Sequence, residues 1–240
     1  MAATVAEMTP GSLEFDEHGH AGPEHLDREY VAGYDRKAAT DPSDDVEALR
    51  GAGVSDSSVV VDLGAGTGTF AAAIAPWCRE VIAVDVSIPM LSAIKSRCDE
   101  LGLQNVHCVA AGFLSYEHRG APADAVYSRN ALHHLPDFWK AVALARIAGF
   151  LAPGGVLRLR DLVYSFEPRD AEVALERWYE GASATADVGW TRAELEEHVR
   201  TEYSPFSWTL EPMLEHCGFE IRTAEYAASK TYAAYTCIRI

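Results

Sequence analysis

The stretch that decides the fold of this chain is VVVDLGAGTGTF, residues 59–70. Its three consecutive valines are typical of a short strand that is buried on both faces of a parallel sheet. A glycine-rich turn at 64–68 follows the strand directly, and the apolar residues 70–74 predict a helix after it. Such an arrangement brings backbone N–H groups close to a ligand, because glycine has no Cβ to hold the ligand away.

Strands and helices alternate along the chain that follows. Ser87 is suited to cap a helix over 88–101, which Gly102 closes. A second helix is expected over 137–151, before the turn Pro153-Gly154-Gly155. Further strands are expected at 81–84, 106–109, 123–127 and 156–160. This alternation predicts βαβ units, hence an α/β fold with a doubly wound, mostly parallel sheet and helices on both faces.

Two last strands, 220–226 and 232–238, are close enough in sequence to pair as an antiparallel hairpin, which completes a seven-stranded sheet. Before the sheet, a helix over 24–39 places Tyr30 and Tyr34 on one face. After the fifth strand the alternation stops, and an aromatic, helical stretch follows. The expected organisation is an N-terminal helical lid (1–58), a core (59–162), a helical insertion over the substrate (163–210), and the last helix and strands of the core (211–240).

Two carboxylates indicate what the glycine-rich turn binds. Asp85 stands at the end of the second strand, where an acidic side chain can accept hydrogen bonds from both ribose hydroxyls of an adenosine. The dinucleotide fingerprint requires a third glycine where this chain has Thr69, and Asp62 lies at the mouth of the turn. A carboxylate there repels a pyrophosphate but attracts ammonium and sulfonium groups. The pattern therefore favours a cationic nucleoside such as S-adenosyl-L-methionine (SAM) over a dinucleotide.

Four motifs in order make this pattern specific. They are VDLGAGTG at 61–68, the acidic loop at 81–87, SRNALHHLP at 128–136 and LAPGG at 151–155. Together they resemble the SAM-binding motifs of class I methyltransferases, in particular the small-molecule branch of the ubiquinone/menaquinone C-methyltransferase type. The resemblance covers roughly residues 30–160 and implies a Rossmann-like fold, SAM as cofactor and a small-molecule methyl acceptor.

The same resemblance implies a set of cofactor-binding residues. The methionine portion of SAM is expected on the turn, the ribose on Asp85, and the adenine on the apolar residues beyond it. One departure is Gly112, where the family often has an acidic residue for the adenine amino group; the Phe113 backbone is expected to hold the adenine instead. Tyr30 and Tyr34 either close over the cofactor or are buried as core residues. The full set is Tyr30, Tyr34, Asp62, Gly64, Ala65, Gly66, Thr67, Gly68, Asp85, Val86, Met90, Ala111, Gly112, Phe113, Ser128, Arg129 and Asn130.

Methyl transfer from a sulfonium requires alignment and a dry site, and a base if the acceptor carries a proton that must leave. His133, in the loop expected beside the sulfonium, and Asp161, at the end of the fifth strand, are the catalytic candidates. The alternatives are that His133 packs or caps a helix and that Asp161 makes a structural hydrogen bond. His18, His20 and His25 have no recognised ligand spacing, so no metal is expected.

The aromatic residues of the insertion suggest a pocket for an apolar or planar acceptor, against the alternative of ordinary packing. They are Tyr164, Phe166, Trp178, Trp190, Phe206 and Trp208. The acidic run 194–197 is expected to be a solvated helix face.

The net charge and the cysteine content indicate which classes of partner and which cellular compartment to expect. Twenty basic and 36 acidic residues give a net charge of −16, which disfavours nucleic acid and membrane surfaces as partners. Five cysteines without a CxxC pair, and no expected signal peptide or membrane span, favour a cytoplasmic protein; a homodimer is left open.

The leading hypothesis is a SAM-dependent methyltransferase for a small aromatic or lipophilic metabolite. A SAM-binding protein without methyl transfer and a nicotinamide-dependent oxidoreductase are the alternatives.

Overall fold

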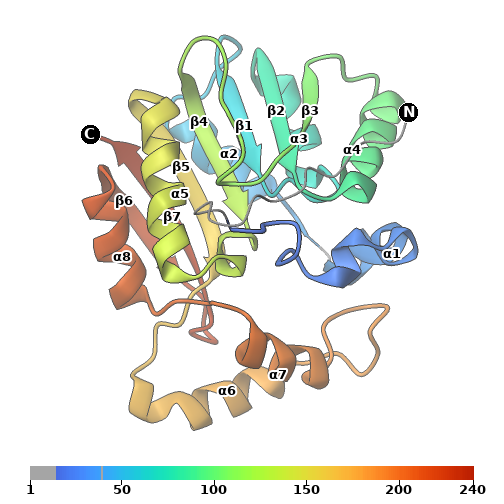
Figure 1. Cartoon of the computed structure of the whole chain (residues 1–240), viewed down its shortest axis with the longest axis vertical. Coiled ribbons are helices and arrows are strands. Elements are labelled where there is room, and N and C mark those ends of the chain that lie inside the picture. Colours follow the sequence, from blue (N-terminus) through green and yellow to red (C-terminus); the bar gives the residue numbers. More distant parts are fainter. Residues whose placement is uncertain (1–14, 39) are drawn as a thin grey trace, which may run out of the picture.

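Seven strands form one sheet in the computed structural model, which describes residues 15–38 and 40–240 (Figure 1). The strand order is β3-β2-β1-β4-β5-β7-β6. β1 to β5 run parallel, whereas β7 is antiparallel to both β5 and β6. The strands are β1 Val59–Leu63, β2 Glu80–Asp85, β3 Val106–Ala110, β4 Ala123–Arg129, β5 Leu151–Leu162, β6 Phe219–Tyr226 and β7 Tyr232–Arg239. The sequence prediction of a Rossmann-like, doubly wound α/β fold with a C-terminal hairpin is confirmed.

Helices cover both faces of this sheet because side chains alternate along each strand. Val60 of β1 packs in a cluster with α2, α3 and α4, whereas its neighbour Val61 packs in a cluster with α5 and α8. All five residues of β1 are buried, as expected for a central parallel strand. The helices are α2 Ser43–Gly51, α3 Thr69–Ile74, α4 Ile88–Leu101, α5 Asp137–Phe150 and α8 Ser207–His216, and short 3-10 turns are η2 Ala75–Trp77 and η3 Leu132–His134.

Local hydrogen bonds explain where the elements begin and end. Ser87 accepts the Met90 N–H at 3.2 Å and so caps α4, and Gly102 ends that helix at a φ of +68°, both as predicted. The helix expected over 24–39 is instead divided into η1 Pro23–Leu26 and α1 Arg28–Ala38. The reason is Asp27, whose carboxylate accepts the N–H groups of Glu29 and Tyr30 at 2.8 and 2.9 Å and starts a new helix.

β5 begins five residues earlier than residue 156, where the sequence pattern placed its start, at Leu151. Leu151 pairs with Ala123 and Val156 pairs with Ala125, so residues 152–155 bulge out of the ladder. The predicted turn is this bulge, in which Gly154 has a φ of +76°.

The insertion lies beyond the carboxyl ends of the parallel strands (Figure 1). It contains η4 Pro168–Asp170, α6 Ala171–Tyr179 and α7 Arg192–Thr201, and the predicted capping box at Thr191 and Glu194 is present. Leu162, Trp178 and Leu195 form a small core of their own beneath these helices.

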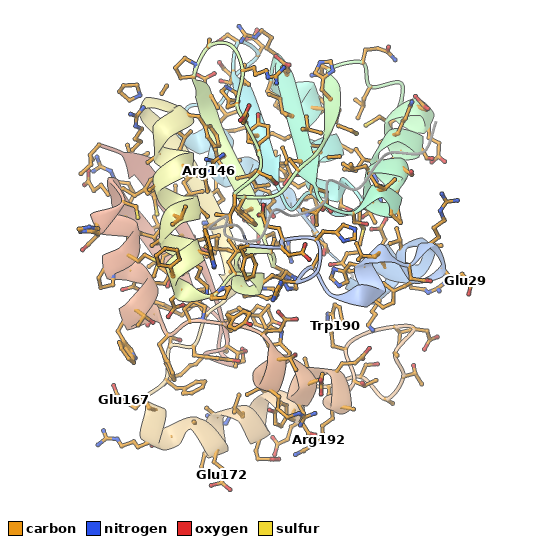
Figure 2. All side chains as sticks on the ribbon, viewed as in Figure 1. Glu29, Arg146, Glu167, Glu172, Trp190 and Arg192 are labelled. Carbon is orange, nitrogen blue, oxygen red and sulfur yellow. The ribbon has the colours of Figure 1, made fainter. Side chains whose placement is uncertain are left out.

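An ion pair joins the insertion to the N-terminal helix. Lys37 of α1, only 5% exposed, donates to the carboxylate of Glu194 in α7 and lies 4.4 Å from the ring centroid of Trp190. Figure 2 shows Trp190 on the side of the insertion that faces α1. Glu194 is therefore not part of a solvated helix face, as its sequence context suggested, but part of a contact between segments 157 residues apart.

Among the described residues, none of the helices has both the length and the apolar character needed to span a bilayer.

Candidate functional site

Two small pockets and a large cavity meet at the carboxyl ends of the parallel strands. The first pocket, about 90 Å³, lies over the ends of β1, β2 and β3, and the second, about 60 Å³, lies over the glycine-rich turn. The large cavity, about 590 Å³, lies between α1, α7 and the loop after β4. The sheet reverses its strand order between β1 and β4, which is where open α/β sheets bind ligands.

The glycine-rich turn approaches its surroundings closely. Gly64 has a φ of +73°, and a Cβ on it would lie 2.4 Å from the Cβ of Ala131. Gly68, with a φ of +77°, would place a Cβ 2.9 Å from Ile94 of α4. Gly68 therefore packs the turn against α4, and it does not itself line the pockets.

Asp85 is held at the end of β2 by two backbone donors. Its carboxylate accepts the N–H groups of Gly66 and Ser87, both at 2.8 Å, and it lines the first pocket. Burial raises the pKa of Asp85 to about 6, although these hydrogen bonds oppose the rise. The raised pKa means that burial disfavours the ionised form of Asp85. A ligand that donates hydrogen bonds to this carboxylate would stabilise the ionised form.

Asp62 lies beside the second pocket and is 1% exposed. Burial, together with the charge of Asp85, raises its pKa well above the usual range, and its Oδ2 atom has no hydrogen-bond partner among the described residues. The same is true of Asn130 Oδ1 and Ser128 Oγ. Buried acceptors without donors are rare in proteins. They fit a cationic ligand that brings N–H donors, such as the ammonium group of an amino acid.

Most of the cofactor-binding residues expected from the sequence line these two pockets. Asn130, with a φ of +50°, contributes to both and also to the large cavity. Three of the expected residues do not line these two pockets: Gly68 packs against α4, Ser128 is buried behind the pockets, and Tyr30 lines the large cavity. Those in place are Tyr34, Asp62, Gly64, Ala65, Gly66, Thr67, Asp85, Val86, Met90, Ala111, Gly112, Phe113, Arg129 and Asn130.

Sequence reasoning missed Glu17, which precedes every recognisable motif. Its carboxylate accepts the N–H groups of Leu114 and Ser115, both at 3.0 Å, and the Ser115 hydroxyl at 2.9 Å. A Cβ on Gly112 would lie only 2.3 Å from Glu17 Oε1. A carboxylate therefore does lie beside residue 112, but it comes from the N-terminal segment, and a Cβ at residue 112 would displace it.

The large cavity is lined by histidine, aromatic and acidic side chains. It shares His25, Tyr34, Asn130 and His134 with the first pocket, so the two are adjacent. Of the aromatic residues proposed from the insertion, Trp190 alone lines it. Tyr164, Phe166 and Phe206 pack on one another, Trp208 stacks on Phe206, and Trp178 packs on His198.

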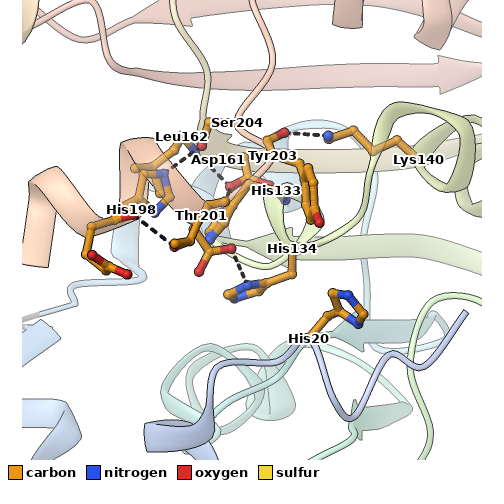
Figure 3. A network of polar contacts seen from close by, with 12 residues as sticks. His20, His133, His134, Lys140, Asp161, Leu162, His198, Thr201, Tyr203 and Ser204 are labelled. Atoms are coloured by element: carbon orange, nitrogen blue, oxygen red, sulfur yellow. Dashed lines mark hydrogen bonds and ion pairs between the residues drawn. The ribbon is translucent and has the colours of Figure 1, made fainter.

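His133 lines this cavity, and Asp161 lies behind it (Figure 3). The imidazole Nδ1 of His133 lies 2.5 Å from Asp161 Oδ1, and Asp161 also accepts the N–H groups of His133 and Leu162 at 3.1 and 2.8 Å. Burial opposes ionisation of Asp161, but the imidazole of His133 and these hydrogen bonds outweigh it and lower the pKa of Asp161. Asp161, 1% exposed, does not face the cleft as its strand position suggested; it fixes His133, whose Nε2 atom is left for other partners.

Three more polar side chains surround His133. His134 Nδ1 lies 2.9 Å from Glu202 Oε2, and the ring of His198 lies 5.0 Å from that of His133. Burial lowers the pKa of His198 and of His25 to about 4, so both are neutral imidazoles at neutral pH. The adjacent histidines at 133 and 134 are visible in the sequence. Glu202 and His198 lie more than sixty residues away, and only the fold brings them there.

The sequence and the fold of this chain are similar to those of known methyltransferases. Residues 60–155 match a family model described as a methyltransferase domain. An uncharacterized methyltransferase of Mycobacterium tuberculosis is 37% identical over 98 residues, which are 41% of this chain and 47% of the relative. This chain thus covers about half the length of that relative. Another, from Geobacillus thermodenitrificans, is 27% identical over 203 residues, 84% of this chain and 82% of the relative.

A solved structure supports the fold over nearly the whole chain. The structure of magnesium protoporphyrin IX methyltransferase from Synechocystis with bound S-adenosylhomocysteine (SAH) superposes with a TM-score of 0.60 at 16% identity, covering 97% of this chain and 90% of that one. At this identity the similarity establishes the fold.

Proposed function

We propose that this chain is a SAM-dependent methyltransferase that acts on a small molecule held in the large cavity. The observation that carries the proposal is the pair of adjoining compartments. One is formed by the two small pockets, lined by the carboxylates of Asp85 and Asp62, whose pKa values are both raised. The other is a histidine-lined cavity that shares four residues with the first pocket. The methyltransferase-domain match and the related fold with bound SAH support SAM as the cofactor.

The residues on both sides of the glycine-rich turn suit the parts of SAM. Asp62 and Asn130, with their unpartnered oxygens, would hold the ammonium group, and Asp85 would accept from the ribose hydroxyls. Val86, Met90 and Phe113 would pack against the adenine, and Glu17 would accept from its amino group. When bound there, SAM supplies an electrophilic methyl group.

The walls of the large cavity suit a small aromatic or lipophilic acceptor. Tyr30, Tyr34, Trp190 and Tyr232 give it apolar faces, and a volume of about 590 Å³ is in the range of metabolite sites. α1 and α7 flank it on two sides, joined by the Lys37–Glu194 ion pair, and would shield a bound acceptor from part of the solvent. His133, with its Nδ1 fixed by Asp161, presents Nε2 as the atom that contacts the acceptor and can take its proton. In this proposal His133 is the catalytic residue and Asp161 positions it.

The test is transfer of label from methyl-labelled SAM to fractions of a metabolite extract. We expect label in one or a few small-molecule fractions with the natural chain and none with Asp85→Ala. If SAH binds but label stays on SAM across a broad panel, the chain binds the cofactor without methyl transfer. If neither SAM nor SAH binds, the proposal is wrong.

Cofactor affinity is also expected to depend on pH. In the free protein the pKa of Asp85 is raised to about 6, and a ligand that hydrogen-bonds the carboxylate favours its ionised form. Binding below pH 6 must therefore displace a proton. SAH affinity should then fall by up to about tenfold per pH unit as the pH drops from 6 to 5. Isothermal titration across this range measures it, and the same decline in Asp85→Asn would contradict the assignment to Asp85.

A further inference from the structure

We propose that His133, His134 and Glu202 bind a divalent transition-metal ion in the wall of the large cavity. One ligand atom from each of the three, a ring nitrogen of either histidine and a carboxylate oxygen of Glu202, can be chosen so that all lie within 4.8 Å of one another. They come from two segments, the turn η3 and the residue that follows α7, and the Tyr203 N–H donates to the His133 carbonyl at 3.0 Å, which joins those segments.

The surroundings of His133 are those of a metal ligand. A histidine that binds a metal almost always donates its other ring N–H to a carboxylate or carbonyl, which fixes the ring and makes it a better ligand. Asp161 accepts from His133 Nδ1 in this way, and Asp161 is itself held by two backbone N–H groups. His133 Nε2 is then the nitrogen available to an ion on the cavity side. With an ion bound there, His133 would be a ligand and not the base, and the ion would take over the role of making the acceptor's proton easier to remove.

His134 and Glu202, which contact each other, would supply the other two ligands of the ion. Their nitrogen and oxygen are 2.9 Å apart, and an ion bound to both would replace the proton that they share. Ligand atoms about 2.0–2.2 Å from zinc lie roughly 3.3–3.5 Å from one another in a tetrahedron. Since one choice of ligand atoms already has no separation above 4.8 Å, side-chain rotations of His133, His134 and Glu202 would be needed to reach this geometry.

The donor set and its charge select the type of ion. Two imidazoles with one carboxylate suit zinc, cobalt, iron or nickel, whereas magnesium and calcium prefer oxygen ligands only. Glu202 and Asp161 together offset a charge of +2 in a site that is largely buried. Three protein ligands leave an open position toward the cavity, as in catalytic metal sites. An oxygen atom of water or of an acceptor would complete the coordination there.

The test is metal binding by the full chain, free of any affinity tag and treated with a chelator. Cobalt(II) should bind with a stoichiometry of one and give the visible absorption of a low-coordinate site, and zinc should displace it. His134→Ala and Glu202→Gln should abolish the absorption, and Asp161→Asn should weaken binding by about 10- to 100-fold. His107→Ala is the matched control, because His107 is exposed, does not line the cavity, and has its ring nitrogen 3.7 Å from a carboxylate oxygen of Glu80.

SAH affinity and thermal unfolding of each variant, measured in parallel, show whether the variant is folded. Absence of cobalt binding by a folded, SAH-binding protein would refute the metal site and leave the proposed methyltransferase function intact. Stoichiometric binding that persists in both His134→Ala and Glu202→Gln would place the ion elsewhere and refute it as well. If the natural chain does not bind SAH, the proposed function is wrong, whatever the result with cobalt.

Discussion

Replacing Asp85 by alanine is expected to weaken SAH binding by about 100-fold or more. A hydrogen bond to a charged group is worth about 1.5–3 kcal/mol, and two ribose hydroxyls would lose their acceptor at once. The substitution also removes the acceptor for the Gly66 and Ser87 N–H groups, so the turn loses its anchor to β2. Isothermal titration with SAH measures the effect.

Two variants make the result for Asp85 specific. Asp85→Asn keeps one acceptor oxygen and the size of the side chain, so its loss should be intermediate. Asp99→Ala, an exposed residue of α4, controls for the change in net charge and should bind SAH normally. Affinity in Asp85→Ala within a few-fold of the natural chain would remove the ribose assignment.

Replacing His133 by alanine is expected to lower the rate of methyl transfer about 10²- to 10⁴-fold, the range for loss of a positioned acid–base group. The acceptor is the one identified by transfer of label from SAM. Because His133 lines the acceptor cavity and not the cofactor pockets, SAH affinity should stay within about twofold.

Asp161→Asn tests the positioning role behind His133. It leaves the cavity walls unchanged but replaces the carboxylate that fixes the imidazole. We expect kcat to fall while KM for the acceptor, SAH affinity and the melting temperature change little. A fall in melting temperature that accounts for the whole loss of activity would mean that Asp161 has only a structural role.

The fold could be predicted from the sequence because its first strands, β1 and β2, are short and rich in β-branched residues, and because strong turn signals separate the strands. The places where the prediction differed are set by single contacts. Asp27 divides the N-terminal helix, and pairing of Leu151 with Ala123 draws the start of β5 forward past a bulge. Neither contact leaves a periodic signal in the sequence.

The residues that line the two small pockets could be predicted from the sequence better than those that line the large cavity, for a physical reason. Most of the pocket is local: Asp62, the turn and Asp85 lie within 24 residues, in a motif with a fixed backbone geometry. The cavity is assembled from distant segments, so the partnership of His134 with Glu202, or of Lys37 with Glu194, has no spacing that a sequence pattern could reveal. Glu17 was missed for the same reason, since Gly112 alone does not say which carboxylate faces it.

The ion pair between Lys37 and Glu194 bears on how ligands enter and leave the site. α1 carries Tyr34, which lines both the first pocket and the large cavity. This one helix therefore covers both the proposed cofactor site and the proposed acceptor site. A ligand that leaves past α1 would have to separate the buried Lys37 from the Glu194 carboxylate and from the Trp190 ring. In the proposed methyl-transfer reaction, release of cofactor or product past α1 would require this ion pair to open, and such an opening could set the rate of release.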